Sequence, residues 1–168
     1  MLLKKHLLLL YFIVLSSISF AQSEEGITTI ILVRHAEKMV SDSADPDLSP
    51  SGIERALRLK QLLINTNIDA IYSTNFLRTK NTVLPLSEAL HLEVKLYDPR
   101  NREITDVFLS KHEGETILIS GHSNTTPQMV NTLINQQKYT SLDEKEYSKI
   151  FIVNISKQKE TKVIELTY

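Results

Sequence analysis

The sequence predicts an α/β fold, a three-layer sandwich around a mostly parallel central sheet that ends in an antiparallel C-terminal hairpin. Three short apolar, β-branched runs at about 28–33, 69–72 and 116–120 are typical of buried strands, and helical apolar patterns follow each of them. Strands that alternate with helices form a sheet covered by helices on both faces. The last two strand-like runs, 149–155 and 162–167, are joined by a polar turn, which predicts a hairpin.

Helices are expected between these strands. The first begins near Ser49 or Ser51, because Ser49 followed by Pro50 forms one possible cap and Ser51-Gly52-Ile53-Glu54 forms a capping box. The sequence does not choose between the two. A second helix at about 76–90 contains Pro85, which predicts a kink or an early start. A strand at about 93–97, a short helix at about 103–110 and a helix at about 126–136 complete the predicted order.

The N-terminus has the three regions of a secretory signal peptide. Lys4 and Lys5 precede an uncharged apolar run that reaches Phe20, and small residues stand where cleavage after Ala21 requires them. The apolar run is shorter than the ~20 residues of a spanning helix, which favours cleavage over a retained anchor. We therefore expect a periplasmic or secreted protein without membrane attachment after cleavage. The predicted boundaries are 1–21 for the signal peptide, 22–27 for a polar leader and 28–168 for one domain.

Composition narrows the class of protein. The 168 residues are 42% hydrophobic, which suits one domain with an ordinary core. The absence of cysteine excludes disulfides, thiolate metal sites and a lipoprotein anchor. Cleavage removes two lysines and no acidic residue, so the formal charge falls from −1 to −3. Nucleic-acid partners call for a basic patch, and none is expected here. No metal and no organic cofactor is expected either.

Side chains suited to anion chemistry follow three of the predicted strands. Arg34 and His35 come directly after the first of them. Arg78 lies shortly after the second, and His122 follows the third. Because parallel strands end at the same edge of a sheet, where ligands bind in open α/β folds, we expect these side chains to lie together. Guanidinium groups bind anions in bidentate fashion, and a neutral imidazole is a nucleophile. The sequence therefore predicts an anion site with a nitrogen nucleophile.

Segments of the chain resemble the histidine phosphatase superfamily, whose fold is phosphoglycerate mutase-like. In chain order they are Leu32-Val33-Arg34-His35-Ala36-Glu37, Leu48-Ser49-Pro50-Ser51-Gly52, Ser73…Arg78…Thr82 and Gly121-His122-Ser123-Asn124. The match covers roughly residues 28–135. The 168 residues less the first 21 are nearly used up by the core fold, so no lid is expected. The resemblance is therefore to the short lidless branch that includes phosphohistidine phosphatases.

The resemblance implies a role for each catalytic residue. His35 is expected to attack the phosphoryl group and carry it as phosphohistidine. Arg34 and Arg78 are expected to bind the non-bridging oxygens, and His122 to donate one further hydrogen bond to them. Phosphoryl transfer then needs little beyond positioning and charge stabilisation.

Substrate-binding residues are expected beside these, namely Ser123, Asn124, Glu37 and Lys38. Ser123 and Asn124 either contact the phosphate or cap the following helix. Glu37 is expected to orient arginines, and Lys38 to attract anionic substrates at the rim. The other two histidines of the predicted domain, His91 and His112, are expected at the surface.

The general acid has no clear motif. An alkyl leaving group needs a proton, which a carboxylic acid usually donates. Many members of the family place a glutamate after the third strand, but residues 97–103 lack that motif. Asp98 is the first candidate and Glu103 the second. The alternative is that no dedicated acid exists, as in phosphatases that act on phosphohistidine.

The expected function is that of an exported phosphatase. It would hydrolyse a phosphomonoester or phosphoramidate through a phosphohistidine intermediate, on a small phosphorylated substrate or a phosphoprotein. A phosphoglycerate-mutase-like phosphotransferase is one alternative, although an open site favours water as the acceptor. A non-catalytic phosphate- or phosphopeptide-binding module is the other, although binding alone does not require His35.

Overall fold

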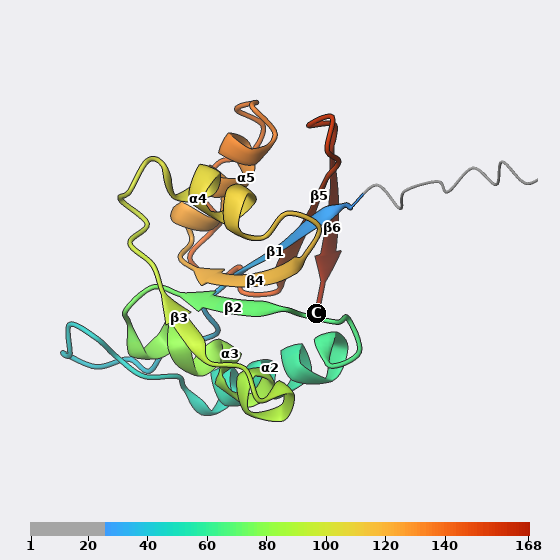
Figure 1. Cartoon of the computed structure of the whole chain (residues 1–168). Helices are drawn as coiled ribbons and strands as arrows, with labels where there is room; N and C mark the ends of the chain where they lie inside the picture. The colour runs from blue at the N-terminus through green and yellow to red at the C-terminus, as the bar shows by residue number, and fades with distance from the viewer. Residues whose placement is uncertain (1–25) are drawn as a thin grey trace, which may run out of the picture.

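The computed structural model describes residues 26–168, so the expected signal peptide and most of the polar leader lie outside the described residues. A six-stranded sheet with the order β3-β2-β4-β1-β5-β6 forms the middle layer. Helices α2 and α3 cover one face, and α4 and α5 cover the other (Figure 1). The predicted three-layer α/β architecture is confirmed.

The helices and strands agree closely with the predicted ranges. In chain order they are β1 (Thr28–Arg34), α2 (Pro50–Leu63), β2 (Ala70–Ser73), α3 (Leu77–Leu90), β3 (Val94–Leu96), α4 (Ile104–Lys111), β4 (Thr116–Gly121), α5 (Thr125–Leu133), β5 (Lys149–Ile155) and β6 (Thr161–Thr167). No helix within residues 26–168 is long and apolar enough to cross a membrane.

Strand β1 lies between a parallel neighbour, β4, and an antiparallel one, β5. Its register with β4 sets Arg34 opposite Gly121, and the backbone N–H of His35 donates to the Gly121 carbonyl at 2.9 Å. The residues that follow the two strands therefore leave the sheet at the same edge. Strands β5 and β6 form the predicted antiparallel hairpin.

Strand β1 is buried on both faces of the sheet, which explains its unbroken apolar run. Ile30 and Leu32 pack in the core under α4 and α5. Ile31 and Val33 pack on the opposite side with residues of α2 and α3. A strand covered on both faces needs apolar side chains at every position rather than at alternate ones.

Helix α2 begins after Ser49, which settles the choice between the two predicted caps. The Ser49 hydroxyl accepts the backbone N–H of Gly52 at 3.2 Å, and Pro50 occupies the first helical turn. A Cβ atom at Gly52 would lie 2.1 Å from the Glu37 carbonyl oxygen. Only glycine allows α2 to approach the segment that follows β1 so closely.

One expectation about the histidines is wrong. His91 is exposed, as predicted, but His112 is buried with 4% of its surface accessible. Its Nε2 lies 2.8 Å from the Tyr72 hydroxyl, and its Nδ1 lies 2.6 Å from a Glu115 carboxylate oxygen. The ring closes the end of α4 against the sheet because both of its nitrogens find partners there.

Candidate active site

A pocket of about 870 Å³ lies at the carboxyl edge of the parallel strands. The structure brings nearly all the predicted site residues to its lining, namely Arg34, His35, Lys38, Arg78, Asp98, His122, Ser123 and Asn124. Glu37 and Glu103 are not among the lining residues. The two imidazole rings lie edge to face with centroids 5.6 Å apart.

His35 is oriented by its own backbone. Its Nδ1 lies 2.8 Å from the Ala36 carbonyl oxygen, and because a carbonyl can only accept, Nδ1 carries the proton. Nε2 of the neutral ring therefore keeps its lone pair. Burial, with smaller contributions from Arg34, Arg78 and His122, lowers the pKa of His35 to about 4, against the bond to Ala36. The ring is consequently unprotonated at neutral pH, which is the state that a nitrogen nucleophile requires.

Arg34 is fixed by a distant segment of chain. Its Nη1 donates to the carbonyl oxygens of Asp143 at 2.7 Å and Glu146 at 2.9 Å. Its Cζ lies 4.2 Å from the centre of the Tyr147 ring. Nε is buried and has no hydrogen-bond partner among the described residues. A buried donor without a partner is costly, and Arg34 lines the pocket, where its guanidinium group is suited to an anionic ligand.

Arg78 pairs with Asp45, a residue that the sequence analysis did not single out. Its Nη1 lies 3.4 Å from Asp45 Oδ1, and its Cζ lies 4.4 Å from the centre of the Phe76 ring. Both carboxylate oxygens of Asp45 also accept the backbone N–H of Leu77, at 3.0 and 3.1 Å. Phe76 precedes α3 and cannot cap it, so Asp45 caps the helix from the loop before α2.

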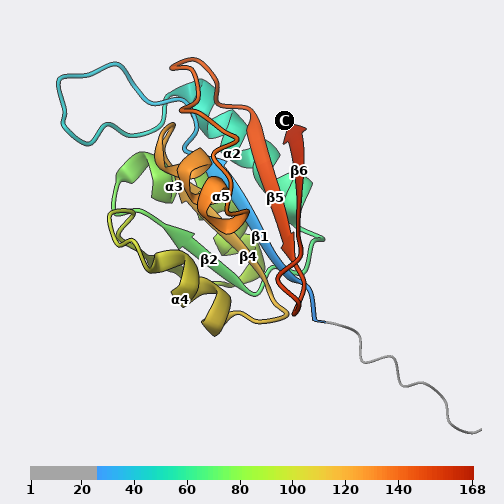
Figure 2. The same ribbon diagram turned by 90° about the horizontal axis from the view of Figure 1, so that it is seen from above.

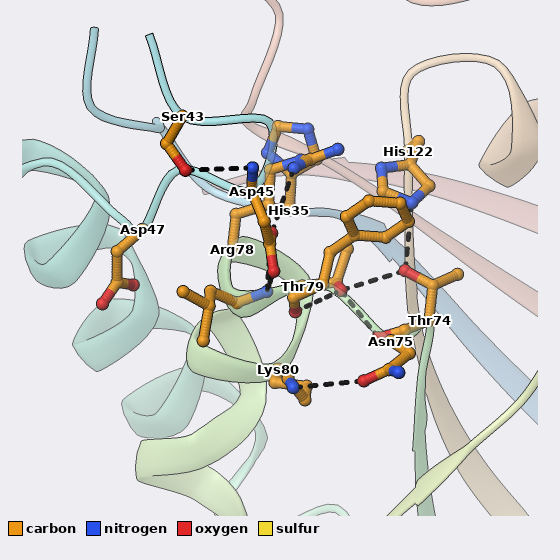
Figure 3. Close-up of polar contacts among 12 residues, drawn as sticks. His35, Ser43, Asp45, Asp47, Thr74, Asn75, Arg78, Thr79, Lys80 and His122 are labelled. Atoms are coloured by element: carbon orange, nitrogen blue, oxygen red, sulfur yellow. Dashed lines mark hydrogen bonds and ion pairs between the residues drawn. The ribbon is translucent and has the colours of Figure 1, made fainter. Parts of the chain in front are cut away.

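A chain of hydroxyl groups determines the protonation of His122 (Figure 3). Thr79 can donate only to carbonyl oxygens, those of Thr74 and Phe76, both at 2.9 Å. Thr79 must then accept the Thr74 hydroxyl at 2.9 Å, and Thr74 in turn accepts from His122 Nε2 at 3.0 Å. Nε2 therefore carries a proton. Burial, with smaller contributions from Arg78 and Arg34, lowers the pKa of His122 to about 4.

Thr82 connects the two arginine segments. Its hydroxyl accepts the Ala36 N–H at 2.8 Å and donates to the Arg78 carbonyl at 2.7 Å. The loop that carries His35 and the helix that carries Arg78 are thus held to each other by a fully buried side chain.

The Glu37 side chain was expected at the substrate site, but Glu37 is not among the residues that line the pocket. Its carboxylate binds Arg55 of α2 at 2.7 Å, and Arg55 also donates to the Tyr168 carbonyl. Glu37 therefore does orient an arginine, but neither of the two in the pocket. It fastens the segment after β1 to α2 and to the C-terminus.

The acid candidates differ in their surroundings. Asp98 forms an ion pair with Arg100 at 3.0 Å, and hydrogen bonds from Arg100 lower the pKa of its carboxyl group. An ionised carboxylate is a poor proton donor. Glu144 lines the pocket as well, and no motif in the sequence marked it.

Ser123 and Asn124 lie between β4 and α5. Asn124 is the N-cap residue of α5, but its side chain makes no capping hydrogen bond. The Thr125 hydroxyl instead accepts the His122 N–H at 3.0 Å. The Asn124 amide thus stays free to meet a ligand. Within residues 26–168, no three His, Asp or Glu side chains are grouped so that they could hold a metal ion.

Comparisons of the sequence and of the structure with known proteins indicate the same class of protein. The sequence model of the histidine phosphatase superfamily (branch 1) matches residues 30–105, which include Arg34, His35 and Arg78. Solved histidine phosphatase structures share the fold, so the resemblance seen in the sequence is confirmed. Residues 30–105 thus match the sequence model of the superfamily, and the chain shares its fold with solved histidine phosphatases.

The individual proteins that resemble this chain share with it either a short stretch of similar sequence or the fold at low sequence identity. Phosphoserine phosphatase 1 of Hydrogenobacter thermophilus is 42% identical over 71 residues, which are 39% of this chain and 34% of that protein, about a third of its length. The structure of the protein histidine phosphatase SixA with tungstate has a TM-score of 0.68 at 15% identity, covering 83% of this chain and 96% of SixA. Mycobacterial hydrolase 1 has a TM-score of 0.70 at 11% identity, covering 84% and 99%.

Proposed function

We propose that the protein is a phosphatase that hydrolyses a phosphomonoester or phosphoramidate through a phosphohistidine at His35. In the first step Nε2 of His35 forms a bond to phosphorus while the bond to the leaving atom breaks, and the leaving group takes up a proton. In the second step water attacks phosphorus, the N–P bond breaks, and inorganic phosphate leaves. The observation that carries the proposal is the neutral His35 ring, fixed by Ala36 beside two arginines.

The two arginines supply the charge stabilisation in this proposal, because the one ring proton of neutral His122 is already donated to Thr74. The guanidinium groups of Arg34 and Arg78 would bind the non-bridging oxygens, whose negative charge is spread further in the transition state. Replacing either arginine with alanine should cost ~2–4 kcal/mol of transition-state stabilisation. Lysine should recover only part of that loss, because it lacks the bidentate geometry.

The state of Asp98 favours a reaction without a dedicated acid. A leaving group that departs readily, such as an imidazole or an aryl oxide, needs little help from a proton donor. We therefore expect Asp98→Asn to leave the hydrolysis of phosphoramidate and p-nitrophenyl phosphate nearly unchanged. A selective loss on alkyl phosphates would instead make Asp98 the acid.

Phosphoenzyme trapping separates this proposal from its alternatives. A labelled phosphodonor with rapid quenching should yield an acid-labile, base-stable adduct in the wild type and none in His35→Ala. A mutase-like phosphotransferase would form the adduct but pass it to a second substrate faster than to water. A phosphate- or phosphopeptide-binding module would bind the donor and form no adduct, which would overturn the proposal.

The substrate, the independence of metals and the location are parts of the same proposal. The partial match to a phosphoserine phosphatase and the fold of SixA support a small phosphorylated molecule or a phosphoprotein as substrate. Activity should survive EDTA. The sequence of residues 1–21 supports export to the periplasm or the medium. N-terminal sequencing of the exported protein should begin at Gln22, and a chain that still begins at Met1 would contradict cleavage.

A further inference from the structure

His35 is oriented by one end of a peptide group whose other end faces a carboxylate. The carbonyl oxygen of this group belongs to Ala36 and lies 2.8 Å from His35 Nδ1. Its N–H belongs to Glu37 and donates to the carboxylate of the same residue. Because a peptide group is planar, a contact that fixes its N–H end also fixes the direction of its carbonyl. The Glu37 carboxylate therefore bears on His35 from outside the pocket.

Arg55 of α2 holds the Glu37 carboxylate with three hydrogen bonds. Its Nε lies 3.0 and 2.9 Å from the two carboxylate oxygens, and its Nη2 lies 2.7 Å from Oε1. A planar fork of this kind fixes both the place and the rotation of a carboxylate. Burial alone would raise the pKa of Glu37, but the hydrogen bonds from Arg55 and from its own N–H lower it. The carboxylate is therefore ionised at neutral pH.

The remaining nitrogen of Arg55 is held by Tyr168, which follows β6. Nη1 of Arg55 donates to the Tyr168 carbonyl oxygen at 2.7 Å, and Cζ lies 5.4 Å from the centre of the Tyr168 ring. The N–H of Tyr168 donates in turn to the Ser148 carbonyl oxygen at 3.0 Å. Figure 2 shows this end of the chain beside α2. Each guanidinium nitrogen thus has an acceptor within the fold, and Arg55 does not line the pocket.

The peptide groups before and after this one are fixed by other contacts. The Thr82 hydroxyl accepts the Ala36 N–H at 2.8 Å, and the Ser49 N–H donates to the Glu37 carbonyl at 2.8 Å. Neither contact involves the Ala36 carbonyl or the Glu37 N–H. A carboxylate that accepts this N–H also polarises the peptide group, which makes the Ala36 carbonyl a stronger acceptor for His35.

We propose that Arg55 is a positioning residue for His35, because the carboxylate that it holds fixes the peptide group that sets the tautomer of His35. Without Arg55 the Glu37 side chain is free to rotate, and the bond from Nδ1 to Ala36 weakens. The neutral ring then carries its proton partly on Nε2, which leaves no lone pair there to attack phosphorus. The inference rests on the proposed function, in which His35 is the nucleophile, and adds the residue that keeps Nε2 unprotonated.

Nitrogen-15 NMR of the His35 ring at neutral pH tests the inference without turnover. In the wild type we expect the proton on Nδ1. In Arg55→Met, which keeps a long side chain but not the fork, we expect a measurable fraction on Nε2. Arg55→Lys keeps the charge and one hydrogen bond, so it should show a smaller fraction, and it carries the test if Arg55→Met does not fold. A wild-type tautomer in both variants would overturn the inference.

Kinetics with p-nitrophenyl phosphate separate positioning from contact with the substrate. In Arg55→Met kcat should fall about tenfold, the lower end of the loss that follows removal of the partner orienting a ligand histidine. KM and the inhibition constant of inorganic phosphate should change less than about twofold, because Arg34 and Arg78 remain in the pocket. A rise in KM as large as the fall in kcat would mean that Arg55 acts on substrate binding, against the inference.

Arg58→Met is the matched control. Arg58 is an exposed arginine of the same helix, lies outside the pocket, and acts on Glu37 through its charge rather than through a hydrogen bond. It should leave the tautomer and kcat unchanged. Glu37→Gln removes the carboxylate, so combining it with Arg55→Met should lower kcat by no more than about twofold beyond the worse single variant. Additive losses would show that the two residues act separately and would contradict the proposed contact.

The two proposals fail in different ways. If the wild type hydrolyses p-nitrophenyl phosphate while the Arg55 variants keep the wild-type tautomer, the positioning role is wrong and the phosphatase stands. If Arg55→Met shifts the tautomer but the wild type hydrolyses no ester and forms no adduct, the positioning role stands and the phosphatase is wrong.

Discussion

At the scale of single residues, His35 and His122 combine burial with neighbouring arginines. Both imidazoles have a pKa lowered to about 4 from an ordinary value of 6.5. We expect their ring proton signals in NMR to titrate with midpoints near 4 in the free protein. A midpoint near 6.5 for His35 would show that it is partly protonated at neutral pH and would weaken its role as nucleophile.

The same shifts predict how stability depends on pH. Between pH 6.5 and about 4 the unfolded chain binds protons at these histidines that the folded chain does not bind, so the free energy of unfolding falls as the pH falls. Above pH 6.5 both states are neutral there and the contribution is constant. Urea denaturation at pH 7 and pH 5 should show a smaller loss for His35→Ala than for the wild type. An equal loss in both proteins would contradict the assignment.

The hydroxyl chain at His122 is a second residue-scale prediction. Thr79→Val keeps the shape of the side chain but removes the acceptor for the Thr74 hydroxyl, which is then free to donate to His122. Nitrogen-15 NMR should find the proton of neutral His122 on Nε2 in the wild type and partly on Nδ1 in the variant. A proton on Nδ1 in the wild type would refute the chain of donors.

At the scale of elements, the loop between β1 and α2 supports α3 through Asp45. Asp45→Asn keeps an oxygen for the Leu77 N–H but removes a negative charge beside Arg78. Inorganic phosphate should therefore inhibit this variant a few-fold more strongly. Asp45→Ala also loses the cap and should destabilise the protein by about 1 kcal/mol.

Asp42→Asn is the control for the Asp45 variants, because Asp42 is an exposed residue of the same loop. It should match the wild type in phosphate inhibition and in urea denaturation. Weaker phosphate inhibition in Asp45→Asn would mean that the carboxylate mainly holds Arg78 in position.

At the scale of the whole molecule, a ligand that binds only the folded chain raises its stability. Inorganic phosphate at 100 times its Kd should add about 2.7 kcal/mol. For a domain of this size that corresponds to a rise in Tm of roughly 5–10 °C. Arg34→Ala and Arg78→Ala should lose most of the rise, and Arg58→Ala should keep it. An equal rise in all four proteins would place the phosphate outside the pocket.

The sequence alone determined the helices and strands of this fold and the central residues of its candidate site. Strands buried on both faces have unbroken apolar runs, and a helix cap such as Ser49 is a local contact, so both leave a pattern in the sequence. Arg34, His35 and His122 were recognisable because Arg34 ends β1 and the two histidines directly follow β1 and β4. Local signals of this kind do not depend on what packs beside them.

Only the tertiary structure decided which distant groups complete the site. Arg34 is held by carbonyl oxygens of Asp143 and Glu146, and every residue has a carbonyl, so no motif marks them. Asp45 caps α3 from another loop, and His112 is buried against Tyr72 of β2. Such contacts depend on the order and register of the strands, which arise from packing between segments far apart in the chain.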